Sequence, residues 1–400
     1  MSKQIQDAYI VAATRLPVGR RKGMLGHVRP DDMLAHAIRS VLAQTPGLDP
    51  ALVEDVIVGC AMPEAEQGMN VARIGLLLAG MPNSVPGVTV NRFCASGLQT
   101  VAMAADRIRL GEAEVMVAGG TETMSLMNQM TGNKTALNPA IFEKEENYAI
   151  GFGMGITAEK VAAQWQVSRE DQDAFAVDSH RKACAAIDAG HFRAEITPYA
   201  VKRRLPDLAS GAVKVAEYLA ENDEGPRRDS SIEGLARLRP VFAARGTVTA
   251  GNSSQMSDGA AAVLLVSERI LKQFDLQPLA RFAGFSVAGV APEIMGIGPV
   301  EAIPRVLRQA GISQHEVDWV ELNEAFAAQA LAVMRTLDLD PAKVNPLGGA
   351  IALGHPLGAT GAIRTATLLH GLRRTRRRYG MVSMCIGTGM GAAGLFESIQ

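Results

Sequence analysis

The stretch VPGVTVNRFCASG, residues 85–97, joins a short β-branched run to a segment of small residues that holds a single cysteine. Residues 85–90 are typical of a buried strand, whereas residues 97–110 carry apolar side chains at helical spacing. We therefore expect Cys94 in the first turn of a helix, where unpaired N–H groups and the helix dipole would lower its pKa. The alternative for Cys94 alone is a structural thiol, since free cysteine is often buried.

Strand-like runs and amphipathic helices alternate around this junction. The expected strands cover residues 8–12, 55–60, 85–90 and 114–118, and the expected helices cover 31–44, 70–79 and 97–110. This alternation is typical of an α/β fold with a largely parallel, covered sheet. Residues 121–249 differ, because they hold polar loops, a charged helix over 168–189 and the turn-rich NDEGPRRDSS at 222–231. We expect this segment to be an excursion from the core.

A second set of α/β elements follows the excursion. AAAVLLVS at 260–267 reads as a core strand, and a new series of elements starts near residue 280. Both halves place a Val-Asn pair, at Val90 and Val344, before a glycine-rich turn, a helix and an apolar strand that ends in glycines. This shared rhythm suggests an internal duplication with the active site between the halves.

Composition limits the class of protein. With 400 residues and 48% hydrophobic content, the chain can form two or three domains with large cores. The 40 basic and 41 acidic residues give a net charge of −1, so neither a nucleic acid nor a membrane surface is expected as partner. The basic run RRTRRR at 373–378 is explained by a solvated helix end, with an anionic ligand as the alternative. No apolar segment approaches the ~18 residues of a membrane span.

The four cysteines, Cys60, Cys94, Cys184 and Cys385, form neither close pairs nor a CxxC motif. They therefore predict free thiols in a reducing compartment rather than a disulfide framework or a zinc ribbon. The N-terminus MSKQIQDAYIVAATRLPVGR lacks the apolar core and cleavage site of a signal peptide. We expect a soluble, cytoplasmic protein.

GHPLGATG, from Gly354, presents His355 between a glycine and a proline, ahead of a helix expected from about Thr360. This is a tight, fixed turn. Histidine has an unperturbed pKa of ~6.5, so it can take a proton from a thiol near neutral pH. A capping or core histidine is the alternative for His355 taken alone.

Two further motifs supply polar groups. CIGTGMG places Cys385 at the end of a strand, and its glycines could expose backbone N–H groups to an oxyanion. These glycines lack the lysine of a P-loop and the downstream acid of a dinucleotide site. NEAFA places Asn323 at the expected start of a helix, as an N-cap or as a group that orients a water or carbonyl. The alternative for Cys385 is a buried strand-end thiol.

Taken together, these motifs resemble the thiolase family, from AATRLPVG at Ala12 to the C-terminus. NRFCASG, TAGNSSQMSDGAA, NEAFA, GGAIALGHPLGATG and CIGTGMG match in order and spacing. The resemblance implies a layered αβαβα thiolase fold of two duplicated halves, 1–275 with an inserted loop domain at about 121–249, and 276–400. It also implies that Cys94 is the nucleophile and Cys385 the group that moves a proton at the substrate carbon. By the same resemblance, His355 activates Cys94 and helps line an oxyanion hole, and Asn323 holds a water in that hole. The N–H groups of Cys94 and Gly387 would form a second oxyanion hole.

The resemblance further implies that the loop domain covers coenzyme A, which enters as a substrate without any other cofactor or metal. Arg227 would meet the nucleotide phosphates, Ser254 the pantetheine, and Met154 with Phe326 the channel near the thioester. One departure concerns subtype, because short-chain biosynthetic members often carry a histidine where this chain has Gly153. That difference favours a degradative enzyme for longer acyl chains.

The predicted function is therefore thiolytic cleavage of 3-ketoacyl-CoA by CoA in fatty acid β-oxidation, with a biosynthetic acetoacetyl-CoA thiolase as the alternative. A decarboxylating ketosynthase would carry a histidine in place of Cys385. A non-catalytic protein could instead bind acyl-CoA, or bind zinc through Cys94, His355 and Cys385. The family also implies a homodimer or homotetramer and allows a hydratase-dehydrogenase partner.

Overall fold

The computed structural model describes residues 5–127, 137–207 and 209–399. Within these ranges a sheet of ten strands runs in the order β10-β11-β12-β9-β1-β8-β5-β3-β4, with β2 beside β8. Its strands are β1 (Ala8–Arg15), β2 (Gly19–Arg20), β3 (Asp55–Gly59), β4 (Gly87–Val90), β5 (Val115–Thr123), β8 (Ser257–Ser267), β9 (Ala280–Gly289), β10 (Val317–Leu322), β11 (Tyr379–Ile386) and β12 (Met390–Ser398).

The strand order repeats between the halves. The N-terminal half runs β1-β8-β5-β3-β4, and the C-terminal half runs β9-β12-β11-β10 with matching directions. A parallel bridge between Val320 and Val344 takes the place that β4 has beside β3. The halves meet where β1 pairs with β9, at Tyr9 with Arg281 and Ile10 with Ala280. The predicted α/β fold with an internal duplication is confirmed.

The expectation of a largely parallel sheet was wrong. Among the named strands of the described ranges, the parallel pairs are β3 with β4, β3 with β5 and β10 with β11, and the other pairs are antiparallel. The reason is the connection of the last strands. β11 and β12 are joined through Gly387, Thr388 and Gly389, a turn far too short for the crossover that parallel neighbours need.

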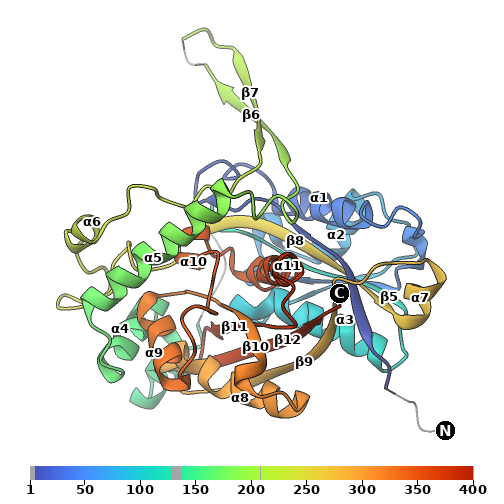
Figure 1. Cartoon of the computed structure of the whole chain (residues 1–400). Coiled ribbons are helices and arrows are strands. Elements are labelled where there is room, and N and C mark those ends of the chain that lie inside the picture. The colour runs from blue at the N-terminus through green and yellow to red at the C-terminus, as the bar shows by residue number, and fades with distance from the viewer. Residues whose placement is uncertain (1–4, 128–136, 208, 400) are drawn as a thin grey trace.

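Helices divide this curved sheet into layers (Figure 1). α1 (Pro30–Leu42) and α2 (Val71–Leu78) cover the outer face of the N-terminal half, and α8 (Gly298–Ala310) and α9 (Ala327–Leu337) cover that of the C-terminal half. α3 (Ser96–Arg109) and α11 (Leu357–Thr375) lie side by side between the halves and contact strands of both. The result is the αβαβα arrangement that the sequence predicts.

α3 and α11 approach each other through glycines. A Cβ atom on Gly97 would lie 2.7 Å from the backbone nitrogen of Ala362, and one on Gly361 would lie 2.1 Å from that of Leu98. Side chains would therefore hold the two backbones apart. Because Cys94 and His355 directly precede these helices, this contact fixes the distance between the predicted nucleophile and its base.

The excursion lies outside the main sheet, as expected, although β5 extends into it as far as Thr123. It contains α4 (Met154–Gln164), α5 (Arg169–Asp188), α6 (Ile232–Ala236) and a hairpin of β6 (Tyr199–Pro206) and β7 (Val213–Ala220), which projects from the body (Figure 1). Residues 128–136 and 208 of the excursion lie outside the described residues. At the hairpin base, buried Arg15 contacts Glu195 and Asp223 at 2.7 Å each.

Two short helices complete the fold, α7 (Glu268–Gln273) and α10 (Ala350–Leu353). None of the helices in the described ranges combines the length and the apolar character that a bilayer crossing requires. The basic run at 373–378 is explained largely by local contacts, since Arg374 donates to the carbonyl of His191, Arg377 to that of Asp318, and Arg378 pairs with Glu397.

We expect Gly361→Ala to destabilise the protein by roughly 2–3 kcal/mol, because its methyl group would overlap the backbone of α3. Denaturant unfolding followed by circular dichroism measures this change. Gly47→Ala is the matched control, since a Cβ there meets no atom within 4 Å and should change stability by less than about 0.5 kcal/mol. Equal stability of the two variants would contradict the proposed role of the α3–α11 contact.

Candidate active site

Cys94 lies in a single 3₁₀ turn, Phe93–Ala95, directly before α3. The predicted strand-to-helix junction is thus confirmed, and Cys94 lies two residues before Ser96, the first residue of α3. Phe93 has a φ of +44°, a conformation that costs a bulky residue energy. The turn is held by Asn91, whose Oδ1 accepts from the N–H of Phe93 at 2.8 Å, and by Ser96, whose Oγ accepts from the N–H of Arg92 at 2.9 Å.

The expected lowering of the Cys94 pKa was wrong for the free protein. Burial of the thiol raises its pKa to about 11, and the carboxylate of Glu122 acts in the same direction. The backbone N–H groups of Gly387 and of Cys94 itself lower the pKa, but they do not outweigh the loss of solvation. Cys94 is therefore a thiol at rest, and its thiolate must form as it reacts.

His355 follows Gly354, which has a φ of +92° and would carry a Cβ only 2.5 Å from Oγ of Ser257. That hydroxyl oxygen accepts from the N–H of His355 at 3.1 Å. On the ring, Nδ1 lies 2.7 Å from Oγ1 of Thr360, and Nε2 lies 3.4 Å from Nδ2 of Asn323. In the tautomer that carries its hydrogen on Nδ1, Nε2 accepts from the NH₂ group of Asn323 and is the ring atom that can take up a proton.

Burial lowers the pKa of His355 to about 3, and the charge of Arg364 lowers it further in the same direction. The unperturbed value near 6.5 used in the sequence analysis therefore does not apply. His355 is a neutral imidazole at physiological pH, which is the form that a base requires.

Asn323 follows the last residue of β10, and its N–H donates to the carbonyl of Ser383 at 2.9 Å. The next helix, α9, begins only at Ala327, so the N-cap alternative for Asn323 was wrong. Its Oδ1 is buried and has no hydrogen-bond partner within the described part of the chain. A water molecule could satisfy this acceptor.

Cys385 is the penultimate residue of β11 and is fully buried. Burial raises its pKa well above the ordinary range, and the charge of Cys94 raises it further, so the two thiols interact. Gly387 begins the turn after β11, and a Cβ there would lie 3.4 Å from Sδ of Met154. Cys385 is thus kept protonated beside Cys94, with the Gly387 N–H directed at the same place.

Apolar side chains form one wall of this site. Phe326, Met154 and Cys385 belong to one hydrophobic cluster, as the predicted channel requires, and Met295 joins them. Phe242 packs edge to face on Phe326 with ring centroids 6.2 Å apart. Met295 and Phe242 were not predicted from the sequence, because both lie outside the recognisable motifs.

A cavity of about 310 Å³ is lined by residues of α5, α6 and the segment that leads to Ser254. Its lining residues are His180, Arg227, Asp229, Ser230, Ser231, Gly234, Leu235, Leu238, Ala250, Gly251, Gln255 and Ile351. Arg227 is exposed there, and its N–H donates to Nδ1 of His180 at 3.1 Å. Ser254 is not in the lining, but it lies between Gly251 and Gln255, and its N–H donates to the carbonyl of Ala325 at 2.9 Å.

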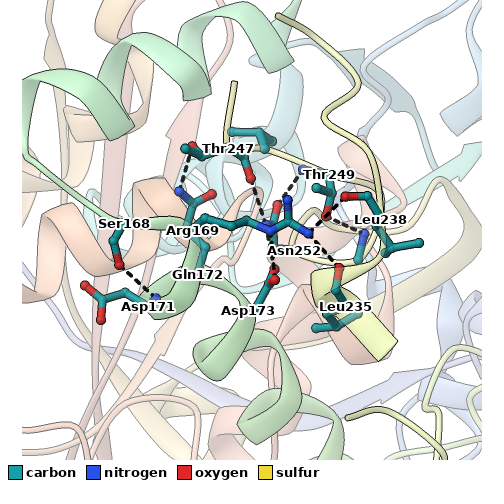
Figure 2. A network of polar contacts seen from close by, with 12 residues as sticks. Ser168, Arg169, Asp171, Gln172, Asp173, Leu235, Leu238, Thr247, Thr249 and Asn252 are labelled. Atoms are coloured by element: carbon teal, nitrogen blue, oxygen red, sulfur yellow. Dashed lines mark hydrogen bonds and ion pairs between the residues drawn. The ribbon is translucent and has the colours of Figure 1, made fainter. Parts of the chain in front are cut away.

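Figure 2 shows how the cavity wall is fastened to α5. Arg169 pairs with Asp173 at 2.7 Å and donates to the carbonyls of Leu235 and Leu238. Asn252 donates to Asp173 at 2.9 Å, and its Oδ1 accepts from the N–H of Thr249. The loop that lines the cavity and leads to Ser254 is therefore held by a buried polar network.

The zinc alternative gains no support from the geometry. Within residues 5–127, 137–207 and 209–399, no group of three or more His, Cys, Asp or Glu side chains could hold a metal ion. Cys60, Cys94, Cys184 and Cys385 are all free thiols.

Two thiols, a neutral imidazole and turn N–H groups, contributed by both halves, are the groups that acyl transfer through cysteine would use. Family models described as the N-terminal and C-terminal domains of thiolase match residues 8–269 and 276–398. The chain belongs to the thiolase family.

Comparisons with individual relatives agree with this family assignment. A 3-ketoacyl-CoA thiolase of Bacillus subtilis is 49% identical, over 98% of this chain and 100% of its own. An acetyl-CoA acetyltransferase of Pseudomonas aeruginosa is 46% identical, and the match covers 97% of this chain and 98% of that protein. The crystal structure of a Bacillus anthracis acetyl-CoA acetyltransferase covers all of both chains with a TM-score of 0.89 and 39% identity.

Because the pKa of Cys94 is raised to about 11, its thiolate fraction at pH 8 is only about 10⁻³ and grows tenfold per pH unit. We expect alkylation of Cys94 by iodoacetamide to accelerate from pH 7 to pH 9 without levelling off. Peptide mass spectrometry measures the rate at this site, with Cys94→Ser as control. A plateau below pH 8 would contradict this value.

Proposed function

We propose that this chain catalyses the thiolytic cleavage of 3-ketoacyl-CoA by CoA, giving acetyl-CoA and a shortened acyl-CoA in fatty acid β-oxidation. The observation that carries the proposal is that Cys94 and Cys385, from opposite halves, face one place: the N–H of Gly387, two residues after Cys385, hydrogen-bonds the sulfur of Cys94, and a Cys94 thiolate would raise the pKa of Cys385. Cleavage of a carbon–carbon bond needs both a nucleophile and an acid, and these thiols can divide the two tasks.

In the first half-reaction, Sγ of Cys94 attacks the 3-keto carbon while its proton passes to Nε2 of His355. The new N–H can then donate to the oxygen that becomes negative, together with a water held by Asn323. The bond between C2 and C3 breaks, and its electron pair stays on C2 as the enolate of acetyl-CoA. Cys385, kept protonated by burial, gives its proton to that carbon.

In the second half-reaction, the acyl group remains on Cys94 until a second CoA arrives. The Cys385 thiolate takes the proton of the CoA thiol, whose sulfur attacks the acyl carbon. The backbone N–H groups of Cys94 and Gly387 would stabilise the negative oxygen. When the carbon–sulfur bond breaks, Cys94 recovers its proton from His355, so both thiols return to their starting state.

CoA would bind as a substrate along the cavity beside α5. Arg227 is exposed in the lining, where its guanidinium could pair with the nucleotide phosphates. The segment around Ser254 leads from this cavity to the cluster of Met154 and Phe326, so pantetheine could follow it towards Cys94. The scheme needs no metal and no further cofactor, because each proton transfer is assigned to a side chain.

Gly153 supports the degradative subtype. It precedes α4, and a Cβ at this position would meet no heavy atom within 4 Å. Gly153 is exposed in the structure, so the preference for the degradative subtype rests on the family resemblance at this position. The alternative, Claisen condensation to acetoacetyl-CoA, uses the same groups in reverse and is favoured by the names of two of the relatives.

We also propose that the chain forms a homodimer through β4. This strand is at the end of the sheet, and within the described residues its outer edge has no strand partner. Val88 on β4 and the neighbouring Met69 and Phe93 are exposed, Met69 at 92%. An apolar edge is suited to pairing with a second copy.

A tetramer, a hydratase-dehydrogenase partner, a cytoplasmic location and the domain division 1–275 and 276–400 stay predictions.

Mixing the protein with a medium-chain 3-ketoacyl-CoA and acetoacetyl-CoA in equal amounts, without free CoA, should leave a medium-chain acyl group on Cys94. Intact mass spectrometry measures the adduct, and Cys94→Ser should carry none. An acetyl adduct alone would shift the assignment to the biosynthetic subtype. The absence of any adduct would overturn the proposed nucleophile.

Light scattering after size exclusion should give twice the mass of one chain for the native protein. Val88→Lys should shift it towards the monomer, because a charge would then lie on the edge strand. The matched control is Val213→Lys on the exposed hairpin, which should leave the mass unchanged. A native monomer, or equal behaviour of both variants, would contradict the β4 interface.

A further inference from the structure

A buried carboxylate lies beneath the proposed active site and has no role in the scheme above. Glu122 is the penultimate residue of β5 and is 0% exposed. Its Oε2 accepts from the N–H of Ala61 at 2.8 Å and from the N–H of Gly358 at 2.9 Å. A single oxygen atom therefore joins the loop after β3 to the first turn of α11.

Each of these partners leads to a proposed catalytic residue. Gly358 is three residues after His355 and stands in the turn that presents the imidazole. On the other side, the carbonyl of Ala61 accepts from Nδ2 of Asn91 at 2.9 Å, and Oδ1 of Asn91 accepts from the N–H of Phe93. Phe93 is the residue before Cys94. The chain of contacts from Cys94 to His355 thus passes through Glu122.

The surroundings of Glu122 are built for an anion. Its Oε1 accepts from the N–H of Met62 at 3.3 Å, from Nε2 of Gln67, and from Sγ of Cys60 at 3.9 Å. All five groups that contact the carboxylate are donors. A neutral amide in its place would direct its own NH₂ group at some of them, which leaves buried donors unpaired.

We propose that Glu122 is a positioning residue whose carboxylate holds the Cys94 turn and the His355 turn at the separation that acyl transfer requires. The inference rests on the proposed roles of Cys94 and His355. A displacement of about 1 Å in a reacting group can cost 10²-fold in rate, so one shared acceptor between the two turns has a direct effect on catalysis.

The same charge has an opposing electrostatic effect on the nucleophile. Glu122 raises the pKa of Cys94, since a nearby negative charge disfavours the thiolate. Its own pKa is raised to about 7 by burial, while the N–H groups of Ala61 and Gly358 act to lower it. Cys60, the other titratable group against Glu122, stays a thiol because burial raises its pKa far beyond the ordinary range. Removal of the charge should therefore make Cys94 more acidic and the enzyme slower.

The variant Glu122→Gln separates the positioning of the two turns from the electrostatic effect of Glu122 on the pKa of Cys94. We expect kcat for a medium-chain 3-ketoacyl-CoA at pH 8 to fall about 100-fold, with KM for both substrates changed less than threefold. The pH profile of Cys94 alkylation by iodoacetamide should shift to lower pH. Glu66→Gln is the matched control, because it removes one acidic charge from the neighbouring turn without a bond to either catalytic loop, and it should behave as the native protein.

An unchanged kcat would overturn the proposal, and so would a fall in kcat that follows a loss of thermal stability with an unshifted alkylation profile. Failure of the proposed function gives a different result, because the native protein would then form no acyl adduct on Cys94. If the proposal holds, Glu122→Gln still forms that adduct, only more slowly.

If Glu122→Gln does not fold, the variant Gln67→Glu tests the positioning role of Glu122. Gln67→Glu would place a carboxyl group against Oε1 of Glu122, where two close acids can share one proton but cannot both ionise at low cost. We expect kcat relative to the native protein to fall about tenfold at pH 9 and to recover towards pH 6.5, as the pair takes up a proton. A native kcat at every pH in this range would overturn the proposal.

Discussion

The contact between α3 and α11 is the constraint on which the rest of the structure depends. Gly97 and Gly361 allow two helix backbones to touch in the middle layer, where side chains of any size would separate them. Each helix begins just after a residue of the proposed site, and each is packed on strands from both halves. The geometry of the site is therefore a property of the junction between the halves, and neither half could hold it alone.

The protonation states of the site residues follow from their buried position between the two halves. Burial keeps Cys94 and Cys385 protonated and His355 neutral, so the two thiols and the imidazole carry no charge in the free site. A site of this kind stabilises charge only where it develops during reaction, through N–H groups that the fold has already oriented. With the proposed base at His355, the thiol would not need a low pKa at rest, because its proton would leave only during attack.

The sequence predicted the motifs well because each is a local feature of a turn. NRFCASG, GHPLGATG and CIGTGMG place Cys94, His355 and Cys385 at element ends, which is where the structure has them. Strand direction was predicted wrongly, because alternation of strands and helices does not reveal that β8 enters between β1 and β5 in the opposite direction. The pKa directions of Cys94 and His355 were also missed, since burial depends on distant segments. Glu122 carries no local signal at all, because its five partners come from three separate parts of the chain.

The matching strand orders have a consequence for how the chain acquired its chemistry. In a structure of two repeated halves, each position has an equivalent in the other half. If the halves were identical in sequence, both would carry the same residues at these positions, and neither set would contain all the groups of the site. In this chain the turn before α3 carries a sulfur and the turn before α11 carries an imidazole, while β11 ends in a second sulfur and β5 in a carboxylate. Because both copies belong to one chain, each can carry different residues at matching positions, and the symmetric scaffold supports an asymmetric centre.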